Sequence, residues 1–171
     1  MNSFELKKIS STNLHILDNL LQLYAHETNK YYDYSIAMGE DGRYIVKTAK
    51  QHLNLGWGYF ILVCGGCSGF ILLNRSTKSQ NGFFIAEFYI LPAYRKAFFY
   101  KEVLIGVLFM LRGNIEFRVL KKNNRALYLF EYLSKRYLSD YSRTEERECG
   151  LDYFRFAFDT SEITILRHLP V

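Results

Sequence analysis

The chain has 171 residues, 49% of them hydrophobic, which is enough to bury the core of one domain and excludes global disorder. The net charge of 22 − 17 = +5 suits an anionic ligand such as a nucleotide cofactor, but it is no specific signal for nucleic acid. Three cysteines, an odd number, argue against a disulfide scaffold and for a reducing compartment. No signal peptide or membrane span stands out. We therefore expect one cytoplasmic domain over residues 1–171 that binds neither nucleic acid nor membrane.

The first half of the chain is predicted to pass from helices to strands. Residues 4–9 alternate weakly, as in an edge strand, and an amphipathic helix follows in which apolar residues recur every three to four positions: Leu14, Leu17, Leu21, Tyr24 and Ala25. A second helix is expected over residues 43–53. Strands over residues 59–63 and 70–73 are expected to be joined around Cys64 to Cys67, where Gly65-Gly66 suits a two-residue hairpin turn.

The second half alternates strands and helices. We expect strands over residues 83–91 and 115–120, the first closed by Pro92, and a helix over residues 99–111 that stops at Gly113. A helix follows from Asn123, and a strand over residues 151–158 closes the sheet, while residues 161–171 receive no assignment. This order predicts an α/β or α+β fold with helices on both faces of a mixed sheet, in which residues 83–119 form a right-handed parallel crossover.

Two sequence motifs follow one another in the second half of the chain. Residues 86–96 (AEFYILPAYRK) place an acidic residue and apolar residues on a strand before a P-x-Y-R turn, and residues 118–126 (RVLKKNNRA) hold a V-x-x-x-N-x-x-A stretch opening a helix. Together they resemble the GNAT acyltransferase superfamily. The resemblance implies a mixed, mostly antiparallel central sheet of six to seven strands. It also implies an N-acetyltransferase that moves an acetyl group from acetyl-coenzyme A to a primary amine of a small molecule or protein, and it allows a homodimer.

The resemblance also implies a binding site for coenzyme A. The pantetheine arm would pair with a free strand edge and contact the start of the later helix, through Phe88, Tyr89, Ile90, Leu91 and Asn123. The pyrophosphate would lie on the turn and the next helix N-terminus, whose N–H groups and dipole attract anions, at Arg95, Lys96, Ala97, Phe98, Tyr100 and Lys101. Phe98 and Tyr100 stand where family members have small residues. An altered acyl donor and a non-catalytic binding module are therefore the alternatives.

Glu87 is the candidate general base, since burial in an apolar strand would raise its pKa. A solvent-facing or arginine-paired carboxylate is the alternative, and His26 is a second candidate base. By resemblance, backbone N–H groups near Tyr89 or Ile90 would stabilise the oxyanion. Tyrosine and acidic side chains after the first helix would bind a cationic, amphipathic amine by cation–π contact and ion pairing, namely Tyr24, Glu27, Tyr31 and Tyr32, with Asp33 and Tyr34 beside them.

Three further features have plainer explanations. Phe130 stands where many family members carry a tyrosine that protonates the departing thiolate. Phenylalanine cannot donate a proton, so we expect Phe130 in the core. Helical rotation turns Tyr128 and Tyr132 away from that position. Cys64 and Cys67 straddle a turn without a second ligand pair, so no metal site is expected. The family likeness places the basic residues Arg118, Lys121, Lys122 and Arg125 near the adenosine phosphates.

Overall fold

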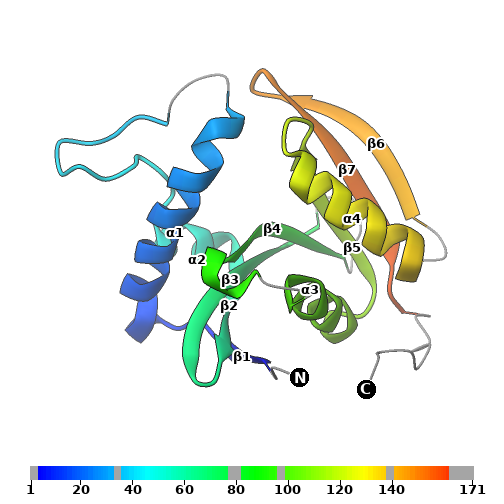
Figure 1. Cartoon of the computed structure of the whole chain (residues 1–171), viewed down its shortest axis with the longest axis horizontal. Helices are drawn as coiled ribbons and strands as arrows, with labels where there is room; N and C mark the ends of the chain where they lie inside the picture. The colour runs from blue at the N-terminus through cyan, green and yellow to red at the C-terminus, as the bar shows by residue number, and fades with distance from the viewer. Residues whose placement is uncertain (1–3, 33–35, 77–81, 96–98, 138–140, 162–171) are drawn as a thin grey trace.

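The computed structural model describes residues 4–32, 36–76, 82–95, 99–137 and 141–161. No helix in these ranges is long and apolar enough to cross a membrane. The chain alternates between a sheet and the helices that cover it (Figure 1), in the order β1 (Phe4–Lys8), α1 (Leu14–Thr28), α2 (Ala49–Leu55), β2 (Gly56–Val63), β3 (Gly66–Arg75), β4 (Phe83–Ile90), α3 (Phe99–Met110), β5 (Asn114–Leu120), α4 (Asn124–Tyr137), β6 (Tyr141–Glu148) and β7 (Leu151–Asp159).

The sheet has seven strands in the order β1-β2-β3-β4-β5-β7-β6. Every neighbouring pair is antiparallel except β4 and β5, which are parallel, as the predicted crossover requires. The expected edge strand at residues 4–9 is confirmed as β1. The expectation that residues 151–158 close the sheet is wrong, because β7 lies inside it and the unpredicted β6 forms the other edge.

Two helical layers cover opposite faces of the sheet (Figure 1). On one face, Leu17 and Leu21 of α1 pack with Phe70 and Leu72 of β3. On the other face, α3 and α4 pack against Ile71 and its neighbours, including Phe117 and Phe156. Successive side chains of a strand point to opposite faces, so the alternation along β3 assigns each helix pair to its own side.

The sheet opens between β4 and β5. These strands pair only where Phe83, Phe84 and Ile85 meet Ile115, Glu116 and Phe117. β4 continues to Ile90 and stays paired with β3. Beyond Ile85, no strand among the described residues pairs with its other edge. The free edge that the resemblance implied is therefore present.

Two local predictions need correction. The second helix begins at Ala49 rather than at Arg43, because Thr48 and Gln51 form a capping box that starts it there, while Tyr44 makes an isolated bridge with Met38. The β2–β3 turn is Cys64-Gly65 rather than Gly65-Gly66, since Val63 pairs with Gly66. Its φ angles of 50° and 77° match a type I′ turn.

Candidate active site

A β-bulge determines where Glu87 points. Leu72 of β3 pairs with Glu87 and Leu73 pairs with Ile85, which leaves Ala86 as an extra residue on β4. Ile85 packs in the α3/α4 core, and regular alternation would send Glu87 there as well. The bulge instead aligns Glu87 with Tyr89, whose ring packs in the α1/α2 core. Glu87 therefore faces α1 and α2, immediately beside the opening of the sheet.

The Glu87 carboxyl group has an unusual proton affinity. Desolvation by the surrounding protein raises its pKa from 4.5 to about 7, against the opposing effects of a Tyr24 hydrogen bond, Lys47 and Arg118. Burial and the facing carboxylate likewise raise the pKa of Tyr24 well above its ordinary value, so its hydroxyl stays protonated and donates to Glu87. A carboxylate that titrates near neutral pH is suited to accept a proton from an ammonium group.

Two cavities meet at Glu87. The acceptor-side cavity, of about 580 Å³, lies between α1, the segment before α2, and β4, and its lining includes Tyr24, Tyr32, Lys47 and His52. The splay cavity, of about 230 Å³, lies in the opening between β4 and β5, where Tyr31 and Arg118 contribute to its lining. Glu87, Tyr24, Thr28 and Tyr32 line both cavities. A ligand in either cavity would reach the same carboxyl group.

The backbone of β4 presents only some of its groups to the splay. The Leu91 N–H donates to the Ser68 carbonyl on the β3 side, whereas the Ile90 carbonyl accepts from Arg95 Nε on the other side. These directions alternate along a strand. The backbone N–H and C=O of Tyr89 therefore also point toward β3, whereas those of Phe88 point into the splay. Of the four residues expected to pair with pantetheine, only Phe88 and Ile90 direct backbone groups into the splay. The same directions bear on the backbone N–H that was expected to stabilise the oxyanion. The Tyr89 N–H points toward β3, so of the two expected donors only the Ile90 N–H points into the splay.

Arg95 and Glu27 were expected in separate sites, but the structure joins them. Both guanidinium Nη atoms of Arg95 donate to the Glu27 carboxylate, and the guanidinium lies 5.2 Å from the centroid of the Tyr89 ring. These bonds to Arg95 lower the pKa of Glu27. The pair fastens the turn after β4 to the end of α1, so neither charge is directed at a phosphate or an amine.

The predicted phosphate loop is described only at its ends, since Lys96, Ala97 and Phe98 lie outside the described residues. The half-buried ring of Tyr100 packs against two apolar clusters of the core. The Lys101 ammonium lies 3.9 Å from the centroid of the Tyr132 ring on α4. Tyr100 also lines a small cavity beside Arg95, in which Arg125 supplies a further cation that the family likeness had placed near the adenosine phosphates.

α4 supplies a cap and a core residue to the site. Asn123, expected to contact pantetheine, is the N-cap of α4, because its Oδ1 accepts the Ala126 N–H at 3.1 Å. Asn123 also lines the splay cavity. Phe130 lies in the core with its ring centroid 3.9 Å from that of Phe117, as expected. Tyr128 is 66% exposed and Tyr132 packs at the rim of the core, so neither lines the splay cavity.

The remaining candidates separate into two groups. Tyr24, Tyr31 and Tyr32 are brought together beside Glu87, while Asp33 and Tyr34 lie outside the described residues. His26 is exposed and its Nδ1 lies 2.8 Å from the Tyr44 hydroxyl, away from both cavities. The three cysteines are free, and the described residues contain no cluster that could hold a metal ion.

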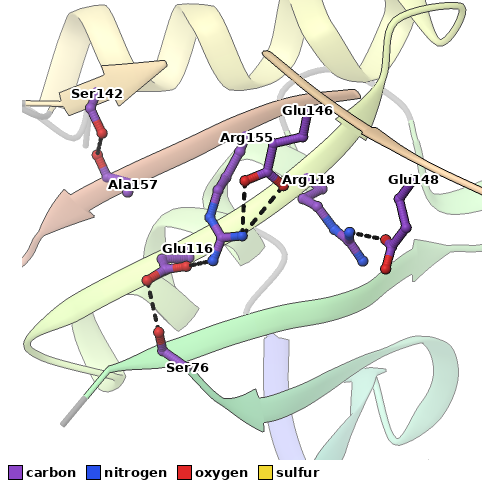
Figure 2. Close-up of polar contacts among 8 residues, drawn as sticks. All are labelled: Ser76, Glu116, Arg118, Ser142, Glu146, Glu148, Arg155 and Ala157. Atoms are coloured by element: carbon purple, nitrogen blue, oxygen red, sulfur yellow. Dashed lines mark hydrogen bonds and ion pairs between the residues drawn. The ribbon is translucent and has the colours of Figure 1, made fainter. Parts of the chain in front are cut away.

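A polar network that the sequence analysis did not anticipate lies on β5, β6 and β7 beside the splay (Figure 2). Arg155 is held between Glu116 and Glu146, and the Ser76 hydroxyl donates to Glu116 at 2.7 Å. The side chains of Glu116 and Arg155 are only 6% and 11% exposed. Arg118, two residues after Glu116 on β5, donates a hydrogen bond to Glu148. The two charged residues of β5, Glu116 and Arg118, which share one face of an otherwise largely apolar strand, were the available signal for this network.

This arrangement, a seven-stranded sheet splayed between parallel central strands with helices on both faces, is the GNAT fold that the resemblance implied. Solved structures with the same fold confirm this assignment. The chain superposes on the ribosomal-protein-S18-alanine N-acetyltransferase from Escherichia coli with a TM-score of 0.63 and 11% identity, covering 96% of this chain and 98% of that one. It superposes on the spermidine N-acetyltransferase from Vibrio cholerae, determined with coenzyme A and spermine, with a TM-score of 0.64 and 13% identity, covering 94% and 97%.

A third example is the IAA acetyltransferase from Bacillus cereus, with a TM-score of 0.59, 12% identity, and coverage of 92% of this chain and 99% of that one. No family model matches the chain, and no curated protein matches it. The likeness therefore lies in the fold alone.

Proposed function

We propose that the protein is an N-acetyltransferase that moves an acetyl group from acetyl-coenzyme A to a primary amine by direct attack. The observation that carries the proposal is the position of Glu87, where a carboxyl group with a pKa of about 7 lies at the junction of two cavities. One cavity reaches the face covered by α1 and α2, and the other follows the free edge of β4. The donor would enter through the second cavity and the amine through the first.

In this mechanism Glu87 removes a proton from the acceptor ammonium, so that the neutral amine can attack the thioester carbon. Tyr24 holds the carboxylate in place and favours its ionised form. The N–H groups of Phe88 and Ile90 are the backbone donors directed into the splay, where negative charge develops on the thioester oxygen. Phe130 cannot donate a proton, so solvent supplies the proton for the departing thiolate.

The described residues fit coenzyme A in part. Coenzyme A supplies the activated acyl group when bound. The free edge of β4 would hold its pantetheine arm through the N–H and C=O of Phe88 and the N–H of Ile90, next to Asn123. The Ile90 carbonyl is already bonded to Arg95 Nε. Arg125 lines the cavity at the start of α3 and makes no ion pair within the part of the chain that the structure describes, so it is the cation best placed for a phosphate. Arg95 contributes by fixing the turn.

The test combines donor binding with turnover. Coenzyme A should raise the melting temperature, by the equivalent of about 2.7 kcal/mol at a concentration one hundred times Kd. Arg125→Gln should weaken this shift, while Arg112→Gln, an exposed arginine beyond the far end of α3, serves as the matched control. Absence of a shift with coenzyme A, acetyl-coenzyme A and longer acyl forms at millimolar concentration would reject the enzymatic proposal.

One observation favours a second candidate, a non-catalytic binding module on the same scaffold. Arg95, the arginine of the family motif, is occupied by Glu27, and Tyr100 fills a position where relatives have a small residue. A donor that binds without acetyl transfer to any amine would support this second candidate. Preference for a longer acyl chain would instead indicate an altered donor.

A further inference from the structure

The charges around Glu87 bear on which amine the site accepts. Among the described residues that line the acceptor-side and splay cavities, Glu87 is the only acid, whereas Lys47, His52 and Arg118 supply basic groups. Lys47 and Arg118 are close enough to lower the pKa of Glu87 against the effect of burial. A multiply charged cation would meet like charges on both sides of the base.

The acids near the site are already bound to arginines. Glu27, expected to attract a cationic acceptor, pairs with Arg95 through both carboxylate oxygens. Glu116 is enclosed by Arg155 and Ser76 (Figure 2). The acidic attraction that the sequence suggested for a cationic amine is therefore neutralised in the folded protein.

Arg118 is placed and shaped to bind a carboxylate. Ile115, Phe117 and Val119 of β5 pack in the α3/α4 core, so Arg118 points to the opposite face, which is also the face of Glu87. Its guanidinium lies between two aromatic rings, 5.4 Å from the centroid of Phe84 and 5.2 Å from that of Tyr153. Aromatic faces hold the planar fork that matches a carboxylate through two parallel hydrogen bonds.

The protein itself now supplies that carboxylate. Glu148, at the end of β6, accepts a hydrogen bond from Arg118, and its side chain is 55% exposed (Figure 2). An ion pair this exposed is weakly held, so a ligand carboxylate can take the place of Glu148 at small cost. The acceptor-side cavity adds an apolar wall for the rest of the molecule, formed by Leu21, Ala25, Ile36, Ile45 and Val46.

We propose that the acceptor is an apolar amino acid with a free carboxylate, whose amine faces Glu87 and whose side chain lies along the apolar wall. Its carboxylate binds Arg118 on the β5 side of the splay cavity, across from the free edge of β4 that would hold the donor. This inference rests on the proposed acetyltransferase function and names its substrate class. It separates the chain from its structural neighbour that acts on spermidine, although the two share a fold. A peptide N-terminus lacks the α-carboxylate and falls outside the proposed class.

The experiment is a calorimetric titration of the full chain with L-phenylalanine, L-phenylalaninamide and spermidine, each with and without coenzyme A. The amino acid should bind at least tenfold more tightly than its amide, because the amide cannot form the charge-assisted pair with Arg118. Arg118→Gln should remove this difference, and Arg118→Lys, which keeps the charge without the fork, should restore part of it. Arg143→Gln is the matched control, since Arg143 lies on β6 and pairs with Glu131 of α4.

Equal affinities for the amino acid and its amide, tighter binding of spermidine, or an amino-acid preference that survives Arg118→Gln would each overturn the inference. Failure of the two proposals can be told apart. Binding of coenzyme A with no preference for the amino acid rejects only the substrate class. Carboxylate-dependent binding of the amino acid without any effect of coenzyme A rejects the acetyltransferase and leaves an amino-acid site.

Discussion

Tyr24 of α1 and Glu87 of β4 meet at the junction of the two cavities, and hydrogen bonding between them lowers the pKa of Glu87 and raises that of Tyr24. The bond joins α1 to β4 at the residue that the bulge turns toward α1. It stabilises the ionised carboxylate in surroundings whose low polarity favours the protonated form, and the balance places the pKa of Glu87 at about 7.

Glu87→Gln should lower turnover about 100-fold at neutral pH, because glutamine cannot accept the proton of the acceptor ammonium. In the native protein kcat/KM should rise with pH up to about 7, as Glu87 ionises, and this rise should be missing in the variant. Initial rates measured across the pH range check both statements. Equal kcat in the two proteins would remove Glu87 from the mechanism.

Tyr24→Phe should move the inflection of the same pH profile to higher pH. The hydrogen bond from Tyr24 lowers the pKa of Glu87, so its loss leaves desolvation less opposed and raises that pKa. Tyr44→Phe, which removes a hydroxyl bonded to the exposed His26, should leave the inflection unchanged. An unmoved inflection in Tyr24→Phe would show that Tyr24 does not tune the base.

Glu87 should also make stability depend on pH. Its pKa is raised on folding, from 4.5 to about 7, so the folded state holds the proton more tightly. The free energy of unfolding should therefore fall as pH rises from 4.5 to 7, by up to about 3 kcal/mol, and then level off. At about pH 8 the Glu87→Gln variant should have a higher free energy of unfolding than the native protein, whereas at about pH 4 it should have no such advantage. Urea unfolding of both proteins at the two pH values measures this, and a pH-independent difference would contradict it.

Removing Glu27 should test what the Arg95 pair contributes. Glu27→Gln should cost roughly 1–3 kcal/mol of unfolding free energy, since the partly buried guanidinium loses a carboxylate bonded through both oxygens. Glu131→Gln is the control, because it breaks the more exposed pair with Arg143 and should cost less than about 1 kcal/mol. Equal losses in chemical denaturation would show that the Arg95 pair is no stronger than a surface pair.

Breaking the buried network should cost more. Glu116→Gln leaves Arg155 with a buried charge that is only partly compensated, so we expect a loss of roughly 3–5 kcal/mol. Replacing Glu116 and Arg155 together by leucine removes both charges and should recover most of that loss. A double variant as unstable as Glu116→Gln would mean that shape, rather than charge balance, holds these strands together.

Tyr100→Gly should destabilise the fold without improving coenzyme A binding. The ring packs against the core, so its removal adds a packing defect to the cost of glycine in a helix, roughly 3 kcal/mol or more in all. Tyr128→Gly, at an exposed position of α4, should cost only about 1 kcal/mol. A gain in coenzyme A affinity for Tyr100→Gly would show instead that the tyrosine obstructs the phosphate.

Sequence periodicity predicted most of the fold but could not locate the bulge. α1, α4 and β5 follow regular apolar spacing, α3 is a continuous apolar run, and the P-x-Y-R motif marks the turn after β4. Regular alternation along β4 would bury Glu87 against α3 and α4, and only the pairing with β3 shows that Ala86 shifts it to the opposite face. Choosing Glu87 from the sequence rested on its charge, while its orientation came from the register.

Long-range pairing also decided what periodicity could not. β6 has a polar sequence with little buried surface, so it carries no apolar pattern and was missed. Glu27 and Arg95 are 68 positions apart, and nothing in either neighbourhood predicts that they bind each other. The capping box of Thr48 and Gln51 is visible in the sequence, yet the second helix was predicted to begin five residues before Thr48, at Arg43.

The charged edge strand β6 has a consequence for how copies of this protein can associate. Its exposed backbone edge is flanked by charged side chains, including Arg143, Glu145, Arg147 and Glu148, and the opposite edge strand β1 displays Lys7 and Lys8. Charges of this kind oppose the joining of two sheets edge to edge. A dimer of this chain would therefore assemble through helical or loop surfaces, and the seven-stranded sheet would remain the limit of strand pairing in solution.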